Sequence, residues 1–204
     1  MAHLQIKPNV FDCAVCHTPC NSESAKHNTF HINKTWGDKA EEIVMFHINK
    51  KGKYKAEETT LGHKYPDLTL FDKSRNMASF VEVKMVSSTF MKIQDKLPEA
   101  KLTPSELVVL NNSAIVNYSK IVQKHNLPIY IVFIVANRPC ITLNDDYKLY
   151  YQNFDVIYDI YKQKKEQRSY TRRIVQGDQD DQGNIQNPLF KVHFSINELM
   201  PYKY

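Results

Sequence analysis

The sequence lacks any apolar run long enough to cross a membrane. Its longest, residues 129–136, falls well short of the roughly 20 apolar residues that a transmembrane helix requires. The amino terminus also lacks the charged and then apolar plan of a secretory signal peptide. We therefore expect a cytoplasmic, intracellular protein that does not associate with membranes.

Cysteine is also scarce, with 4 in 204 residues, which argues against a disulfide framework. There are no internal repeats and no coiled-coil heptads. The chain length favours one domain with additional segments over two full domains, and a 42% hydrophobic share suffices for a packed core. The formal net charge of +5 is compatible with a polyanionic partner but does not prove one.

The most informative stretch covers residues 65–86. Residues 67–71 alternate between polar and apolar, residues 80–86 are rich in β-branched and aromatic side chains, and a polar turn separates them. This pattern predicts a β-hairpin. Because side chains on a strand alternate between faces, Glu82 and Lys84 point the same way, and the hairpin brings Asp67 close to them.

Two carboxylates held close together on an otherwise apolar sheet are costly unless a cation joins them. Mg²⁺ prefers oxygen ligands, so Asp67, Glu82 and the backbone carbonyl of Val83 predict a magnesium site. Lys84 would hold the scissile phosphate, neutralise charge or orient the attacking water, while the metal polarises the phosphoryl oxygen. This chemistry hydrolyses phosphodiesters. The alternative is an ordinary Glu82–Lys84 ion pair on an exposed strand, with Asp67 in a turn.

These residues carry a family resemblance. Pro66-Asp67 followed by Glu82-Val83-Lys84 resembles the signature of the PD-(D/E)XK nuclease superfamily, which includes restriction endonucleases, Holliday-junction resolvases and recombination nucleases. The resemblance covers about residues 36–137. It implies an α/β fold with a restriction-endonuclease-like core, in which helices flank a mixed central sheet. The expected fold also includes a small amino-terminal metal-binding segment, which is predicted separately below.

The superfamily also has a helix before the hairpin, whose glutamate leans toward the metal. A helix is predicted over residues 38–49, and its Gly37-x-x-Ala40-Glu41 pattern resembles that feature. Glu41 is the candidate for this role and Glu42 its competitor. Alternatively, both are ordinary carboxylates in the first turn of a helix.

Two further elements are predicted after the hairpin. Residues 103–106 have the capping-box pattern, which predicts a helix from Thr103 to about Lys124. Residues 129–135 form an apolar run of strand length, typical of a strand buried on both faces. The order helix, hairpin, helix and buried strand matches the superfamily core. A closing strand is predicted over residues 190–196.

The amino-terminal segment contains a cluster of metal-ligand residue types. Four of five candidates would bind a structural Zn²⁺: Cys13, Cys16, Cys20, His27 and His31, with His17 also available. One alternative is a polar terminus with incidental cysteines and histidines. Another is an iron–sulfur cluster that recruits the distant Cys140 as its fourth thiolate.

Basic residues supply candidate DNA contacts after the catalytic strand and in a tyrosine-rich basic region near the carboxyl terminus. The candidates are Lys92, Lys162, Lys164, Lys165, Arg168, Arg172 and Arg173. A solvated helical face is the alternative reading of the basic run. The expected organisation is a zinc-binding segment over residues 1–34, a nuclease core over 35–142 and an extension over 143–204 that packs on the core.

We therefore expect a Mg²⁺-dependent endonuclease acting on double-stranded DNA. A sequence-selective, type II restriction-like enzyme is favoured because the two terminal segments exceed the minimal core, as recognition elements would. The alternatives are a Holliday-junction resolvase or recombination and repair nuclease, and a catalytically inactive zinc-containing DNA-binding protein. The oligomeric state is open, with a homodimer as one option.

Overall fold

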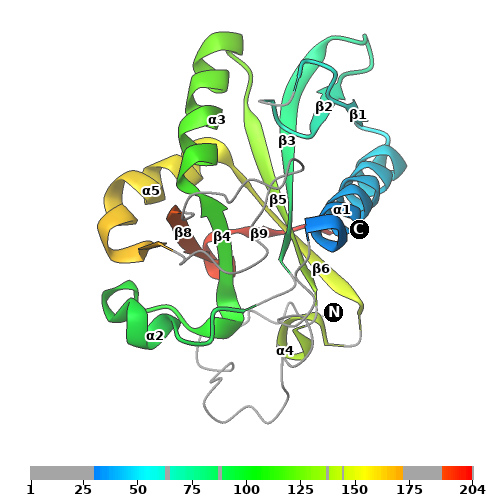
Figure 1. Cartoon of the computed structure of the whole chain (residues 1–204). Helices are drawn as coiled ribbons and strands as arrows, with labels where there is room; N and C mark the ends of the chain where they lie inside the picture. The colour runs from blue at the N-terminus through cyan, green and yellow to red at the C-terminus, as the bar shows by residue number, and fades with distance from the viewer. Residues whose placement is uncertain are drawn as a thin grey trace.

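The computed structural model describes residues 30–62, 65–86, 89–136, 138–143, 145–171 and 190–203, with only the backbone for residues 30–36 and Pro139. These residues form a six-stranded sheet, a three-stranded sheet and helices on both faces of the larger sheet (Figure 1). The predicted α/β class, with a mixed central sheet flanked by helices, is confirmed.

The central sheet has the strand order β1-β2-β3-β5-β6-β9. Its strands are β1 (Lys55–Glu58), β2 (Leu68–Phe71), β3 (Met77–Val86), β5 (Ile129–Ala136), β6 (Tyr147–Asn153) and β9 (Met200–Pro201). The β3–β5 pair is parallel and the other neighbours are antiparallel. The predicted hairpin is the β2–β3 pair, and the predicted buried strand is β5, whose residues are buried at seven of eight positions.

The smaller sheet is antiparallel and has the order β4-β8-β7. It comprises β4 (Leu107–Asn111), β8 (Phe190–Ser195) and β7 (Ser169–Thr171). The predicted closing strand is therefore present as β8, but it joins this second sheet. The chain then reaches the central sheet through β9.

The helices are α1 (Phe30–Lys51), α2 (Ile93–Lys96), α3 (Asn112–His125), α4 (Pro139–Thr142) and α5 (Phe154–Arg168), with 3₁₀ turns η3 (Pro98–Ala100), η4 (Pro104–Glu106) and η5 (Ile196–Glu198). Among the described helices, none is both long and apolar enough to cross a membrane.

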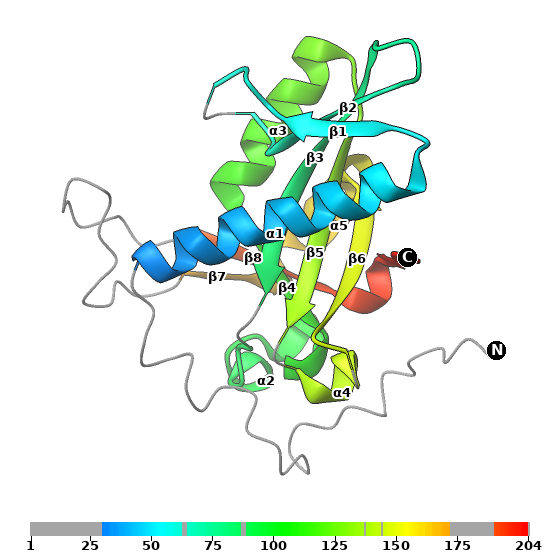
Figure 2. The same ribbon diagram turned by 90° about the vertical axis from the view of Figure 1, so that its right-hand side faces the viewer.

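Side-chain alternation on the central strands produces two hydrophobic cores. Val81 and Val83 of β3 pack with Ala40 and Val44 of α1 on one face. Figure 2 shows α1 lying across this face. Phe80 of β3 belongs to the other core, to which α3, α5 and the small sheet also contribute. β3 thus lies between two layers, and Glu82 points to the face that α3 covers.

The prediction of one helix from Thr103 to Lys124 is wrong in its first part. The capping box forms as expected, since Glu106 Oε1 accepts a hydrogen bond from the Thr103 backbone N–H at 2.7 Å. It closes only the single turn η4, however, and residues 107–111 continue as β4. The β-branched residues Val108 and Val109 suit a strand, and pairing with β8 satisfies the backbone there.

The helix before the hairpin is longer than predicted, because α1 begins at Phe30 and not near residue 38. Glu41 and Glu42 therefore lie in the middle of a 22-residue helix. The explanation that they are carboxylates of the first turn, favoured there by the helix dipole, is wrong.

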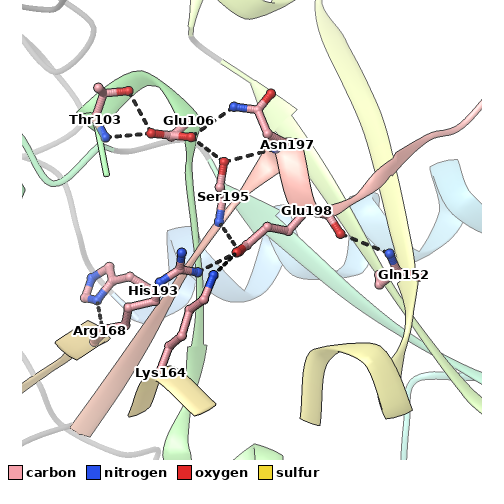
Figure 3. A network of polar contacts seen from close by, with 9 residues as sticks. All are labelled: Thr103, Glu106, Gln152, Lys164, Arg168, His193, Ser195, Asn197 and Glu198. Atoms are coloured by element: carbon pink, nitrogen blue, oxygen red, sulfur yellow. Dashed lines mark hydrogen bonds and ion pairs between the residues drawn. The ribbon is translucent and has the colours of Figure 1, made fainter. Parts of the chain in front are cut away.

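Polar contacts attach the last residues of the chain to the small sheet and α5 (Figure 3). The buried Glu106 carboxylate accepts hydrogen bonds from Ser195 Oγ and from Asn197 Nδ2, the latter at 3.0 Å. Gln152 of β6 donates to the backbone carbonyl of Glu198 at 2.9 Å. The expected boundary at residue 142 falls between β5 and β6 of one sheet, so the residues after it complete the central sheet.

Candidate active site

Asp67 is fixed immediately before β2. Its backbone carbonyl accepts a hydrogen bond from Thr59 N–H at 2.9 Å, and its side-chain Oδ2 accepts one from Val83 N–H at 2.7 Å. Because β2 begins at Leu68, which pairs with Val81, the Asp67 carboxylate takes up the N–H of Val83 where the β2–β3 ladder ends. The hairpin thereby places Asp67 against the strand segment that carries Glu82 and Lys84.

Glu82 and Lys84 lie on the same face of β3, as predicted, and form an ion pair between Oε1 and Nζ. The Glu82 side chain is only 5% exposed, whereas that of Lys84 is 35% exposed. The alternative that this is an ordinary ion pair on an exposed strand is therefore wrong, because Glu82 is buried. Tyr118, from α3 on the same side of the sheet, hydrogen-bonds to the Glu82 carboxylate. The buried carboxylate is thus held from two sides.

Asp67 and Glu82 face a common cavity of about 320 Å³, which we call the carboxylate pocket. Its other lining residues include Tyr65, Ser113, Asn117 and Tyr118. Three of these come from the first two turns of α3, and Ser113 lies in the first turn, where the positive end of the helix dipole favours negative charge. The pocket therefore combines two carboxylates with hydroxyl and amide groups that can hold a polar ligand.

The charges at this site perturb one another. Burial and the neighbouring Glu82 charge raise the pKa of Asp67, while Lys84 and the Val83 N–H lower it, and the net effect is a rise from the ordinary 3.8 to about 6. Burial alone would lower the pKa of Lys84, but the charges of Glu82 and Asp67 outweigh it, and the net pKa is raised. Lys84 therefore remains an ammonium group.

Glu41, on α1, is close enough to Asp67 and Glu82 for their charges to affect its pKa. Burial, together with the charges of Asp67, Asp38 and Glu82, raises its pKa from 4.5 to about 7. Glu42, by contrast, is exposed. Glu41 does not line the carboxylate pocket, and across the described part of the chain no group of three or more His, Cys, Asp or Glu is arranged to hold a metal. The carboxylates that meet are therefore Asp67 and Glu82.

The candidate zinc ligands belong to the amino-terminal segment, outside the part of the chain that the structure describes with side chains. Cys13, Cys16, Cys20 and His27 lie outside the described residues, as does the His31 side chain. Cys140, the thiolate of the iron–sulfur alternative, is half-buried in α4.

The candidate DNA contacts of α5 differ in their surroundings (Figure 3). The prediction that Arg168 is a surface contact to DNA is wrong, because its side chain is only 7% exposed and pairs with Glu198 at 2.6 Å. Lys164 pairs with the same carboxylate at 3.2 Å. The exposed Lys162 pairs with Asp159, one turn earlier on the same helix, at 2.8 Å.

The remaining candidates are divided between the surface and the parts outside the described residues. Lys165 Nζ lies over the rings of Tyr161 and Phe190, at 5.4 and 5.8 Å from their centroids. Lys92 is exposed just before α2. Arg172 and Arg173 are outside the described residues. Within the described residues, Lys92 and Lys162 are exposed, Lys164 and Lys165 are partly buried, and Arg168 is buried.

Sequence reasoning assigned no role in the site to Tyr118 or Tyr65. Tyr118 was placed on the apolar face of a helix, which is correct, but its hydroxyl reaches a charged partner. Tyr65 lines the pocket, and its hydroxyl contacts Lys124 Nζ at 2.8 Å and His125 Nε2 at 3.2 Å. The polar residues 111–113 could have indicated where α3 begins and that its first turns face the pocket. The prediction of one continuous helix from Thr103 placed them inside that helix instead.

Comparison with known proteins adds little to this geometry. No family model matches the sequence, and no protein of curated function matches it. Among solved structures, the fold is similar to that of Hjc, a Holliday junction resolvase from the archaeal hyperthermophile Archaeoglobus fulgidus. The two are 12% identical, the TM-score is 0.40, and the similarity covers 79% of this chain and 86% of the resolvase. At that score the likeness supports no conclusion about function.

Proposed function

We propose that this protein is a metal-dependent DNA endonuclease of the PD-(D/E)XK type. The observation that supports it best is the shared carboxylate pocket, in which Asp67 and Glu82 lie together beside the Lys84 ammonium. An exposed ion pair and an unrelated turn residue would not produce that arrangement.

The donor set fits Mg²⁺. Asp67 and Glu82 present hard oxygen donors, the proposed carbonyl of Val83 would add a third, and room remains for water, which Mg²⁺ retains. Burial, together with the charge of Glu82, raises the pKa of Asp67, so the metal-free site carries a cost that a divalent cation would relieve. When bound, Mg²⁺ would polarise a phosphoryl oxygen and lower the pKa of its coordinated water.

The residues of this chain supply the remaining functions. Lys84, which is charged and one-third exposed, would neutralise a phosphodiester oxygen as negative charge develops in the transition state. Tyr118 would hold the Glu82 carboxylate in its ligating orientation. Ser113 and Asn117, in the first turns of α3, would donate hydrogen bonds to a phosphate.

Support for a sequence-selective, restriction-type enzyme is weaker than the sequence suggested. That hypothesis used the carboxyl-terminal third as additional recognition surface. Much of this third instead completes the two sheets, and Arg168 and Lys164 pair with Glu198. A structure-selective resolvase or repair nuclease is therefore an equal candidate within the same chemistry.

Cleavage of supercoiled plasmid and of a synthetic four-way junction, each with and without Mg²⁺, tests the proposal. We expect Mg²⁺-dependent cleavage that Glu82→Gln abolishes, and that the matched control Glu42→Gln retains. Discrete bands from plasmid would indicate sequence selection, and cleavage restricted to the junction would indicate a resolvase. DNA binding without cleavage by the wild type would favour the inactive zinc-containing DNA-binding protein.

A further inference from the structure

A second cavity, of about 230 Å³, lies at the carboxyl end of β3. Its aromatic lining consists of Phe90, Tyr170 and His193, so we call it the aromatic pocket. It is smaller than the roughly 300–1,000 Å³ typical of pockets for drug-sized ligands, so it suits a single ring system. No residue of this pocket takes part in the hydrolysis proposed above.

The three rings come from separate parts of the chain and converge. The Phe90 ring, in the segment after β3, lies 5.1 Å from that of Tyr170 in β7 and 5.6 Å from that of His193 in β8. Phe90 and Tyr170 are only partly buried. Accessible aromatic faces in a small cavity favour a planar ligand that can stack.

The polar groups of the pocket narrow the class of ligand. Arg138, 1% exposed, donates to the carbonyls of Ser105 and Leu107 at 3.0 and 2.6 Å, and Lys191 adds a second cation to the lining. His193 Nδ1 lies 3.1 Å from the Arg168 carbonyl, which can only accept, so Nδ1 carries the hydrogen and Nε2 remains an acceptor. The buried Arg138 is held by main-chain carbonyls, so Lys191 is the cation that could meet a ligand. Stacking rings, one cation and an acceptor together match a nucleobase attached to a phosphate backbone.

The aromatic pocket is aligned with the carboxylate pocket along two shared elements. Val86 lines the former and Glu82 the latter, and four residues along a strand correspond to about 13 Å, with both side chains on one face. The other wall runs the same way, since β4 borders the aromatic pocket and leads into α3, which borders the carboxylate pocket. One nucleic-acid strand could follow this path, with Lys84 between the two pockets.

We propose that the aromatic pocket binds an unpaired, unstacked nucleobase of the strand whose phosphodiester occupies the carboxylate pocket. This inference rests on the proposed nuclease function and deepens it, because a base that is paired and stacked in a duplex cannot enter such a cavity. The substrate class is therefore DNA that contains unpaired nucleotides, not continuous duplex. A phosphate ion alone could bind to the Lys191 ammonium but would not stack on the aromatic rings.

Binding measured by fluorescence anisotropy in EDTA tests this without requiring hydrolysis. The probes are a labelled duplex with one unpaired nucleotide and the same duplex fully paired, with the full-length chain. We expect the wild type to prefer the first by about tenfold, and Tyr170→Ala to lose that preference, because stacking on one aromatic ring has about this effect. Tyr170→Phe should retain it, as should the control Tyr151→Ala on the opposite face of the sheet.

A second readout uses Phe90→Ala and 2-aminopurine as the unpaired base. Stacking quenches the fluorescence of this base, so we expect quenching by the wild type and its loss in Phe90→Ala, even if Tyr170→Ala fails to fold. Equal affinity for the two duplexes, or quenching that both substitutions leave unchanged, would overturn the inference. If the protein cleaves DNA but does not prefer the duplex with an unpaired nucleotide, the base-binding inference is overturned and the nuclease proposal stands. If it shows a Tyr170-dependent preference but cleaves no DNA, the nuclease proposal is overturned and base binding stands.

Discussion

The Asp67 carboxylate accepts a hydrogen bond of 2.7 Å from the backbone N–H of Val83, the residue between Glu82 and Lys84. This bond joins the two halves of the catalytic pattern, which are separated by the turn of the hairpin. It also uses one carboxylate oxygen, Oδ2, and leaves Oδ1 for the pocket. The position of Asp67 therefore depends on the register of β2 and β3.

Replacing Asp67 with Asn should separate stability from activity. In the metal-free protein the raised pKa of Asp67 means that the native state binds this proton more tightly than the unfolded chain does. Stability therefore falls as the pH rises from about 4 through about 6 and stays lower above that range. Asp67→Asn should raise the free energy of unfolding at pH 7.5 by about 1–2 kcal/mol, while cleavage is lost.

Urea denaturation at pH 4 and pH 7.5 in EDTA measures this effect. The free energy of unfolding gained by Asp67→Asn should be present at pH 7.5, where the wild-type carboxyl is ionised, and small at pH 4, where it is protonated. At both pH values the Asn side chain still accepts a hydrogen bond from Val83 N–H. A variant that is less stable than the wild type at pH 7.5 would show that the carboxylates do not repel each other.

Removing the Tyr118 hydroxyl should impair catalysis more than folding. Tyr118→Phe keeps the ring in its edge-to-face contact with Phe154, 5.8 Å between centroids, but removes the hydrogen bond to Glu82. A hydrogen bond to a charged group is worth about 1.5–3 kcal/mol, so we expect a rate of cleavage about 10- to 100-fold lower. The apparent Mg²⁺ requirement should rise as well. An unchanged Mg²⁺ titration would mean that Tyr118 does not orient this carboxylate.

Cleavage should depend on pH through two carboxyl groups. Burial, together with neighbouring carboxylates, raises the pKa of Asp67 to about 6 and that of Glu41 to about 7, so activity should increase with pH between about 6 and 8. Glu41→Gln removes the group of higher pKa, and the midpoint of the acid limb should move down toward 6. Single-turnover rates across this range give the profile. A profile identical to that of the wild type would exclude Glu41 from the reaction.

The sequence was sufficient where the pattern is local. The hairpin is defined by alternation within residues 67–86 and by Asp72, whose side chain accepts from the N–H groups of Ser74 and Asn76 in the turn. The β5 strand could be predicted because a short, β-branched apolar run of strand length is typical of a strand buried on both faces, and seven of its eight residues are buried. These elements carry Asp67, Glu82 and Lys84, so the central residues of the site followed from the sequence.

The errors came from partners far away in the chain. Residues 107–111 also fit a helical period, and only pairing with β8, as in Leu107 with Ser195, makes them a strand. The role of Tyr118 at the site depends on that change, because α3 starts only after β4 ends. Arg168 belonged to a basic run that suggested an exposed surface, yet Glu198, 30 residues later, binds it. No local pattern contains such contacts.

The Arg168–Glu198 pair should stabilise the fold without contributing to DNA binding. Arg168→Ala leaves a half-buried carboxylate with fewer partners, so we expect the free energy of unfolding at pH 7 to fall by about 3 kcal/mol. Burial alone would raise the pKa of Glu198, but the hydrogen bonds from Arg168 and the Ser195 N–H lower it, so this stability should be lost as the pH falls below about 4.5.

Chemical denaturation of Arg168→Ala and of the surface control Lys162→Ala tests this. The exposed Lys162 pairs with the exposed Asp159 and lies over the Tyr158 ring, so its replacement should change stability by less than about 1 kcal/mol. Equal stabilities for the two variants would show that Glu198 does not depend on Arg168.

The shared use of Asp67 and Glu82 by one divalent cation is tested most directly by Mn²⁺ binding. Mn²⁺ prefers the same carboxylate, carbonyl and water ligands as Mg²⁺, and electron paramagnetic resonance reports its free concentration. We predict that Asp67→Asn and Glu82→Gln each weaken the same binding event at least tenfold, and that Glu42→Gln leaves it unchanged. Binding that neither Asp67→Asn nor Glu82→Gln alters would contradict a metal site in the carboxylate pocket.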